Sequence, residues 1–254
     1  MMNCRMNGKS LTALDASIWL MDLQEDGAPV NLTTCDLPGR DGTRFLRRKR
    51  AYLTVRIMLA VRERNPMRRN AVLEKIADWC QDGILTVDHR PNQRLHCVCV
   101  QGVESISAVN WADTVTLVFR AYGLPWWEST VPKSVTLTGG ESASIRVGGT
   151  ADSTWAEAEI TAKETVNTLK ITCGDSAMQF TSLAMQAGET LRITWDEEGI
   201  QRIVIQGETE RSALGNRTAD SSDELVLPQR KTVLLSVEAD GGVTAAVKAR
   251  GRYV

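Results

Sequence analysis

The sequence predicts a mainly β protein of two domains: an N-terminal β-sandwich or barrel-like domain with one packed α-helix, and a C-terminal antiparallel β-sandwich. Three observations lead to this fold class. Short segments that alternate apolar and polar residues recur along the whole chain. A single segment, residues 66–82, has its apolar residues at helical spacing instead. The composition, 43% hydrophobic and 24% charged, is typical of a globular protein with buried cores.

The first predicted strand is residues 51–61, which are rich in β-branched and apolar residues. The predicted helix follows at residues 66–82. Asn65 is a favourable N-cap, and Pro66 suits the first helical position because an N–H there would lack a helical partner anyway. Apolar residues then recur every three or four positions, and Gly83 is expected to end the helix as its C′ residue.

Three further strands complete the predicted N-terminal domain, at residues 83–89, 94–103 and 111–122. The first two of these are expected to pair across a short polar turn. In the third, Val115, Leu117 and Phe119 stand at every second position, so they are expected to face the core. The N-terminal domain is therefore expected to be mostly β, with the helix packed on it.

We place the domain boundary at about residue 130, which gives domains 1–130 and 131–254. The first part carries 17 basic and 14 acidic residues and the second carries 13 and 17, so the net charge changes from +3 to −4. Prolines flank Trp126 and Trp127 at this boundary. We expect the two tryptophans to fill the junction between the domains.

The second part reads as a series of short strands separated by turn residues, with no helical pattern. Its expected strands are SVTLTG, ASIRVGG, AEAEITA, NTLKITC, ETLRITWD, IQRIVIQG, DELVLP, KTVLLSVEAD and VTAAVKARGRYV. Pairs such as Gly139-Gly140 and Gly148-Gly149 separate them. About eight or nine strands without a helix predict a two-sheet sandwich.

Motifs that would carry chemistry are scarce. The chain has two histidines, so a His-based triad or a multi-histidine zinc site would need both His89 and His96. In a strand, Cys97 and Cys99 share one face and His96 lies on the other, which divides the one cluster of metal-ligand residue types. We expect Cys97 and Cys99 to pack as small apolar residues. No hydrolase, nucleotide-binding or metalloprotease motif occurs, so we predict no enzyme, no metal and no cofactor.

The densest basic run is RFLRRKR, residues 44–50. A nucleic-acid site would need a wider basic face and stacking aromatics, and the net charge of the chain is −1. We interpret the run as a solvated or inter-subunit loop that leads into the strand at 51–61, without nucleic-acid sequence recognition. The candidate oligomer-interface residues are Arg40, Arg44, Arg47, Arg48, Lys49 and Arg50.

The localisation signals are equally sparse. No apolar stretch has the length of a membrane span, so we expect no membrane insertion. The N-terminus lacks the apolar core of a signal peptide. The six scattered cysteines are expected to be reduced thiols, as in a cytosolic protein.

Several segments follow one another in a distinctive order. They are LPGRDG, RRKRAYLTVRIML, NPMRRNAVLEKIADWCQDG, ILTVDHRPNQRLHCVCVQGV and TVTLVFRAYGLPWW, and then AGETLRITWDEEGIQRIVIQG, DELVLPQRKTVLLSV and RGRYV. The first five resemble the N-terminal domain of the distal tail (Dit) proteins of long-tailed, non-contractile bacteriophages. The last three are similar to the galectin-like sandwich that these proteins often carry at their C-terminus. The resemblance spans nearly the whole chain.

The resemblance implies structural work in a virion tail. Distal tail proteins form a hexameric ring, assembled in the host bacterial cytoplasm, that joins the tail tube to the tail tip or baseplate hub. The implied partners are further copies of the chain, the tail tube protein, the hub protein and, in some relatives, a receptor-binding protein held by the galectin-like domain. The family's ring loop can extend as a long hairpin arm, and residues 39–50 look short for one.

Two other functions stay open at this point. A carbohydrate-binding sandwich, used for adhesion to a host surface, would rest on Trp155, which follows a polar turn and is expected to be exposed. Trp195 shares a strand face with apolar residues and is expected to pack in or near the core. A metal or thiol enzyme would have to use the histidines and cysteines of residues 89–99.

Overall fold

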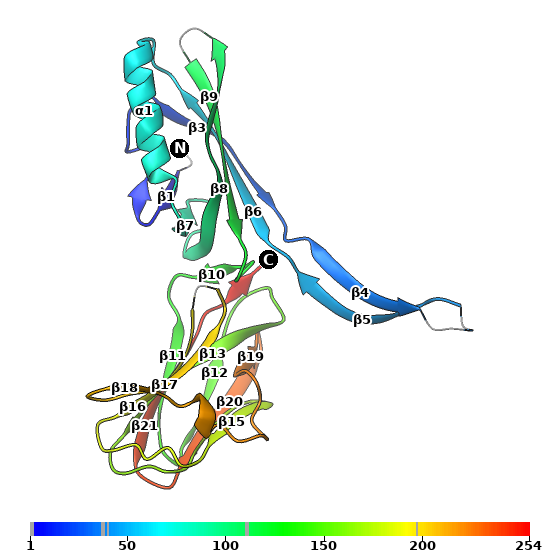
Figure 1. Cartoon of the computed structure of the whole chain (residues 1–254), viewed down its shortest axis with the longest axis vertical. Coiled ribbons are helices and arrows are strands. Elements are labelled where there is room, and N and C mark those ends of the chain that lie inside the picture. Colours follow the sequence, from blue (N-terminus) through cyan, green and yellow to red (C-terminus); the bar gives the residue numbers. More distant parts are fainter. Residues whose placement is uncertain (1–2, 37–38, 40, 110–111, 197) are drawn as a thin grey trace. The chain divides into compact units, whose positions relative to one another are not determined.

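A computed structural model describes residues 3–36, 39, 41–109, 112–196 and 198–254. The chain divides into two compact units, Met1–Trp127 with Val254, and Glu128–Tyr253. Both consist mainly of antiparallel strands, and the described residues include one α-helix (Figure 1). The predicted mainly β fold class is confirmed. No helix in the described part of the chain has the length and apolar character needed to span a membrane.

An antiparallel sheet with the strand order β2-β1-β7-β8-β9-β6-β3 organises the N-terminal unit. Its strands are β1 (Cys4–Met6), β2 (Lys9–Ser10), β3 (Ile18–Asp26), β6 (Leu53–Val61), β7 (Gly83–Val87), β8 (Gln93–Val109) and β9 (Ala112–Ala121). The expected pairing of β7 with β8 across a short turn is present. Two further strands, β4 (Val30–Asp36) and β5 (Thr43–Arg50), form a sheet of their own.

The centre of this sheet buries the apolar face that the alternating pattern predicts. Val115, Leu117 and Phe119 of β9 are fully buried. Ile57 of β6 is also fully buried and lies opposite Leu117 in the ladder. Burial of a side chain of this size contributes about 1.5–3 kcal/mol, so these strands hold the unit together.

The helix α1 (Pro66–Trp79) begins where the sequence predicts. The side-chain oxygen of Asn65 accepts a hydrogen bond from the backbone N–H of Met67 at 2.9 Å, a cap worth about 1 kcal/mol. The ring of Trp79 meets that of Phe119 edge-on, with 6.0 Å between the ring centroids. The buried helix residues are Val72, Ile76 and Trp79.

The expected end of the helix is wrong. The helix stops at Trp79, and Cys80 is its C-cap, with its N–H bonded to the carbonyl of Ile76 at 3.0 Å. Gly83 instead begins β7 with a φ of 138°. A Cβ at this position would lie 2.1 Å from Oδ1 of Asn7, so the approach of the Asn7 side chain, rather than the helix end, requires glycine here.

The C-terminal unit is an antiparallel sandwich of two sheets, as predicted. One sheet has the order β11-β21-β13-β16-β17-β18, with β19 on β13, and the other has the order β12-β20-β14-β15. Both sheets contribute to one core, exemplified by Ile160 and Leu191 from the first and Ile171 and Phe180 from the second. A 3₁₀ turn, Leu214–Asn216, interrupts the otherwise β architecture.

The strands of this unit are β11 (Lys133–Thr138), β12 (Ser142–Arg146), β13 (Ser153–Ala162), β14 (Leu169–Cys173), β15 (Ser176–Phe180), β16 (Thr190–Trp195), β17 (Gln201–Gln206), β18 (Glu210–Ser212), β19 (Val226–Pro228), β20 (Thr232–Ala239), β21 (Val243–Ala249) and β22 (Arg252–Tyr253). The short strand β10 (Trp127–Ser129) pairs with β22 at the start of the unit. There, the N–H of Ser129 donates to the carbonyl of Gly251 at 2.8 Å.

Candidate functional site

The basic run at residues 44–50 lies in a two-stranded hairpin, which we call the arm (β4 and β5). In Figure 1 the arm continues from β3 and β6 as a separate ribbon. The sequence interpretation of residues 44–50 as a loop is therefore wrong, because they form β5 and pair with β4. The expectation that residues 39–50 are too short for an arm is also wrong. It left out β4, which supplies the other half of the hairpin.

The arm packs little of itself against the rest of its unit. All of β4 and all of β5 except Arg50 are exposed to solvent. Exposed apolar side chains are prominent among them: Leu32 is 63% exposed, Phe45 56%, Leu46 53% and Val30 45%. A contiguous set of apolar side chains on an otherwise polar surface commonly marks a protein contact. An isolated hairpin is also only marginally stable in water.

The register gives the arm two different faces. Antiparallel partners share a face, so Val30, Leu32 and Phe45 lie on one side of the ribbon. A β-bulge at the Thr33/Thr34 step, where Leu46 lacks a direct partner, brings Phe45 opposite Thr34 on this side. The first face therefore carries three exposed apolar side chains, interspersed with polar and charged ones.

The predicted basic residues are divided between the two faces. The second face carries Arg44, Arg47 and Lys49, which lie opposite Cys35, Thr33 and Asn31. Arg48 and Arg50 lie opposite Leu32 and Val30 and therefore share the first face with them. Arg40 lies outside the described residues.

Aromatic contacts fix the base of the arm. The guanidinium of Arg50 lies 4.6 Å from the ring centroid of Trp126, within cation–π range. Just past the arm, Tyr52 meets Tyr122 with 5.6 Å between the ring centroids. The guanidinium of Arg120 lies 4.6 Å from the Tyr52 ring. These contacts anchor the point where β5 of the arm continues into β6 of the sheet.

Trp127 is held by a polar cluster around Glu25. Its ring is fully buried, and its Nε1–H donates to Oε2 of Glu25 at 3.0 Å. The same carboxylate pairs with Arg90 at 2.7 Å and contacts Nε2 of His89 at 2.6 Å. The Glu25 carboxylate thus ties the end of β3 to the β7–β8 turn and to Trp127. All of these contacts lie within the N-terminal unit, and a junction role for Trp126 and Trp127 stays a prediction.

The expectation that Trp155 is exposed is wrong, because the residue is half-buried and both faces of its ring are in contact with other side chains. Trp195 stacks on it with 4.3 Å between the ring centroids and an interplanar angle of 16°. The Arg252 guanidinium lies 4.0 Å from the same ring, and two groups at these distances must occupy opposite faces. The Nε1–H of Trp155 donates to Oε2 of Glu224 at 2.9 Å. A sugar could therefore stack on Trp155 only after Arg252 or Trp195 moves away.

The cysteine and histidine segment is divided as its alternation suggests, with one addition. Cys97 is buried, in line with the expected apolar packing. Cys99 is only half-buried, and its Sγ lies 2.7 Å from Sγ of Cys80 at the end of α1. Within the described part of the chain, no three His, Cys, Asp or Glu residues are arranged so that they could hold a metal ion. The Cys80–Cys99 pair was not expected, and the one sequence signal was a cysteine at the helix end.

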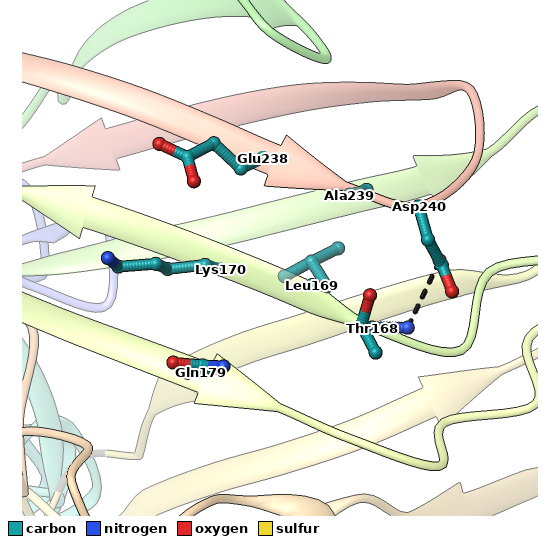
Figure 2. A pocket seen from close by; sticks show the side chains of 7 residues that line it. All are labelled: Thr168, Leu169, Lys170, Gln179, Glu238, Ala239 and Asp240. Carbon is teal, nitrogen blue, oxygen red and sulfur yellow. Dashed lines mark hydrogen bonds between the residues drawn. The ribbon is translucent and has the colours of Figure 1, made fainter.

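A polar depression of about 280 Å³ lies on the outer side of the β12-β20-β14-β15 sheet (Figure 2). Its lining residues are Thr168, Leu169, Lys170, Gln179, Glu238, Ala239 and Asp240. The Asp240 carboxylate accepts hydrogen bonds from the backbone N–H groups of Thr168 (3.1 Å) and Asn167 (3.0 Å). These hydrogen bonds lower the pKa of Asp240, and the bond from the Thr168 N–H has the largest effect. Its carboxylate is thus already occupied in holding the loop before β14.

Comparison with known proteins finds similarity in structure. No family model matches the chain, and no curated protein matches it by sequence. The crystal structure of SPP1 Dit, described as a paradigm of the hub adsorption apparatus in phages that infect Gram-positive bacteria, matches with a TM-score of 0.72 and 11% identity. The match covers 98% of this chain and 99% of that chain. It shows that the two chains share a fold over their whole length, which confirms the predicted resemblance at that level.

Two structures of the phage P2 baseplate in its activated conformation match less well. The structure with Ca has a TM-score of 0.48 and 9% identity, covering 99% of this chain and 98% of that chain. The structure with Sr has a TM-score of 0.48 and 10% identity, covering 98% of each chain.

Proposed function

We propose that this protein is a structural component of a bacteriophage tail, a distal tail protein that forms a hexameric ring between the tail tube and the tail tip or baseplate hub. The observation that carries the proposal is the fold shared with SPP1 Dit across 98% of the chain. A likeness limited to one sandwich would be compatible with many functions, because β-sandwiches are reused widely. Here both units and their order along the chain are matched.

The arm is the part of the chain best suited to a ring contact. A cyclic ring repeats one pair of different patches from each subunit to the next until it closes. The arm offers one such patch, with a face that carries Val30, Leu32 and Phe45 and that its own unit leaves exposed. Of the candidate interface residues of β5, Arg48 and Arg50 lie on that face, and the opposite face carries Arg44, Arg47 and Lys49. They would orient the arm on its neighbour.

The remaining partners follow from the same role. The N-terminal units would form the ring and contact the tail tube protein and the hub protein. The C-terminal sandwich would be available to a receptor-binding protein. The protein would be assembled in the bacterial cytoplasm and act in the virion tail. Its work is assembly, and no residue is assigned to catalysis.

The native mass of the purified chain tests the ring. Six copies of the 28.0 kDa chain give a particle of about 168 kDa, which light scattering and sedimentation distinguish from smaller or open assemblies. Electron micrographs of that particle should show sixfold ring views. A closed ring with another number of copies would overturn the hexamer. A chain that stays monomeric alone and with its tail tube protein would overturn the ring itself.

A carbohydrate-binding sandwich stays a second proposal, with Trp155 as its contact residue once Arg252 or Trp195 has moved off the ring. It is tested by screening the full chain on a glycan array and repeating any hit with Trp155→Ala. Binding that this substitution abolishes would support an adhesion role. An array without hits would remove it.

A further inference from the structure

Two cysteines that are far apart in the sequence meet at the end of α1. Cys80 is the C-cap of the helix, and Cys99 lies in β8, 19 residues further on. Their sulfur atoms are 2.7 Å apart, whereas a disulfide bond is about 2.05 Å long. The two sulfurs therefore need to approach each other by only about 0.7 Å to form a bond.

The surroundings hold this pair in place and leave it open to small reagents. Both cysteines are half-buried, in contrast to the buried Cys4, Cys97 and Cys173. The backbone N–H of Cys99 donates to Oδ1 of Asp82 at 3.0 Å, which ties β8 to the segment that follows the helix. The β8–β9 ladder shifts register just after Cys99, so the strand is irregular where the pair forms.

We propose that Cys80 and Cys99 are an oxidation site that forms an intramolecular disulfide when the folded protein meets a small-molecule disulfide such as oxidised glutathione. The thiolate of Cys99 attacks one sulfur of the reagent and releases one glutathione thiolate. The thiolate of Cys80 then attacks Sγ of the mixed disulfide at Cys99 and releases the second. The protein loses two protons and two electrons, and one oxidised glutathione becomes two reduced molecules.

The new bond would lock the C-terminal end of α1 to β8. It would close the segment 80–99, which holds β7 and the β7–β8 turn, and so restrict the unfolded N-terminal unit. Thiols stay reduced in a bacterial cytoplasm and oxidise outside it, so the lock would form after synthesis, on release from the cell. The inference rests on the geometry of the pair and is independent of the proposed ring; only this timing rests on the proposed function.

Thiol counting and peptide mapping on the full chain test the proposal. Folded protein is incubated with oxidised glutathione, quenched with an alkylating agent in denaturant, and assayed for free thiols. We expect the pair to account for a loss of two of the six thiols. Because trypsin cleaves after Arg94, the disulfide should join the peptide that contains Cys80 to the peptide that contains both Cys97 and Cys99, and the Cys99→Ser variant distinguishes these two.

Matched variants identify the partners. Cys80→Ser and Cys99→Ser should each abolish the linked peptide pair, whereas Cys35→Ser, which removes the exposed arm thiol, should retain it. A thermal melt of each oxidised protein provides a second readout, in which only the wild type and Cys35→Ser should gain stability on oxidation. A map without a link between these peptides would overturn the proposal. A link from Cys80 to Cys97 would do the same.

Discussion

Removing the two largest apolar side chains from one face of the arm should weaken self-association and leave the fold intact. The change is the double variant Leu32→Ser and Phe45→Ser. Leu32 is 63% exposed and Phe45 56% exposed in the single chain. Full burial of such a side chain contributes about 1.5–3 kcal/mol, so covering the exposed part contributes about 1–2 kcal/mol for each residue. Loss of both should cost about 2–4 kcal/mol at each contact.

The expected effect is large enough to measure directly. Since about 1.4 kcal/mol corresponds to a tenfold change in a binding constant, each contact should weaken by about 30- to 1,000-fold. Sedimentation velocity over a dilution series gives the dissociation constants of the wild type and the variant. The melting temperature should stay close to that of the wild type, because both side chains are exposed and substitutions at such positions change stability by about 0.5 kcal/mol or less.

Leu234→Ser provides the matched control. Leu234 is 59% exposed and lies on β20 of the C-terminal unit, so its loss removes the same kind of exposed strand leucine away from the arm. Association of this variant should match that of the wild type. An unchanged dissociation constant in the arm double variant would refute the assignment of this arm face to the interface. An equal weakening in Leu234→Ser would show that the effect is not specific to the arm.

Four further predictions follow from the same structure. Arg47→Glu with Arg48→Glu should weaken self-association without lowering the melting temperature, and unchanged sedimentation at both low and high salt would exclude the basic run from the interface. Ile76→Ala removes a fully buried helix side chain and should cost about 2–5 kcal/mol in denaturant unfolding; a loss below about 1 kcal/mol would contradict this packing. Asn65→Ala should cost about 1 kcal/mol in the same assay, and no measurable loss would argue against the cap. Burial, together with the neighbouring thiols Cys99 and Cys97 and the Asp82 carboxylate, raises the pKa of the Cys80 thiol. Its reactive thiolate is therefore scarce at neutral pH, and oxidation by glutathione disulfide should accelerate between about pH 7 and about pH 8.5; a rate that does not change would contradict this.

The sequence predicts the elements whose faces are buried, because burial leaves a repeating pattern. In β9 the alternation of Val115, Leu117 and Phe119 with more polar neighbours predicts both the strand and its inner face. The helix start is equally local, since Asn65 and Pro66 suffice to identify it. The helix end is not local. Gly83 is of the residue type that commonly ends a helix. Glycine is needed there for another reason, because the side chain of Asn7, which is distant in the sequence, leaves no room for a Cβ.

The candidate interface residues stay a prediction, and the loop conformation expected for them was wrong. The basic run singles out residues 44–50, whereas neither β4 nor β5 has a buried face to produce regular alternation. Phe45 and Leu46 are consecutive apolar residues, and the bulge that leaves Leu46 without a direct partner breaks the period of two. The Cys80–Cys99 contact is hidden for a related reason, because it depends on how the helix end packs on a distant strand.

These failures have a common physical origin that bears on function. A strand that packs inside its own subunit is selected for an apolar face, and that face is visible in one sequence. A strand reserved for a partner buries its apolar residues only in the assembly, so its pattern reflects a surface that the single chain does not contain. Strand β5 has five basic residues around an adjacent Phe-Leu pair, and its conformation is the one that the sequence predicts least well. The same strand is exposed to solvent in the single subunit. That coincidence is expected if the arm is shaped by a neighbouring subunit, and it would be unexplained for a chain that acts as a monomer.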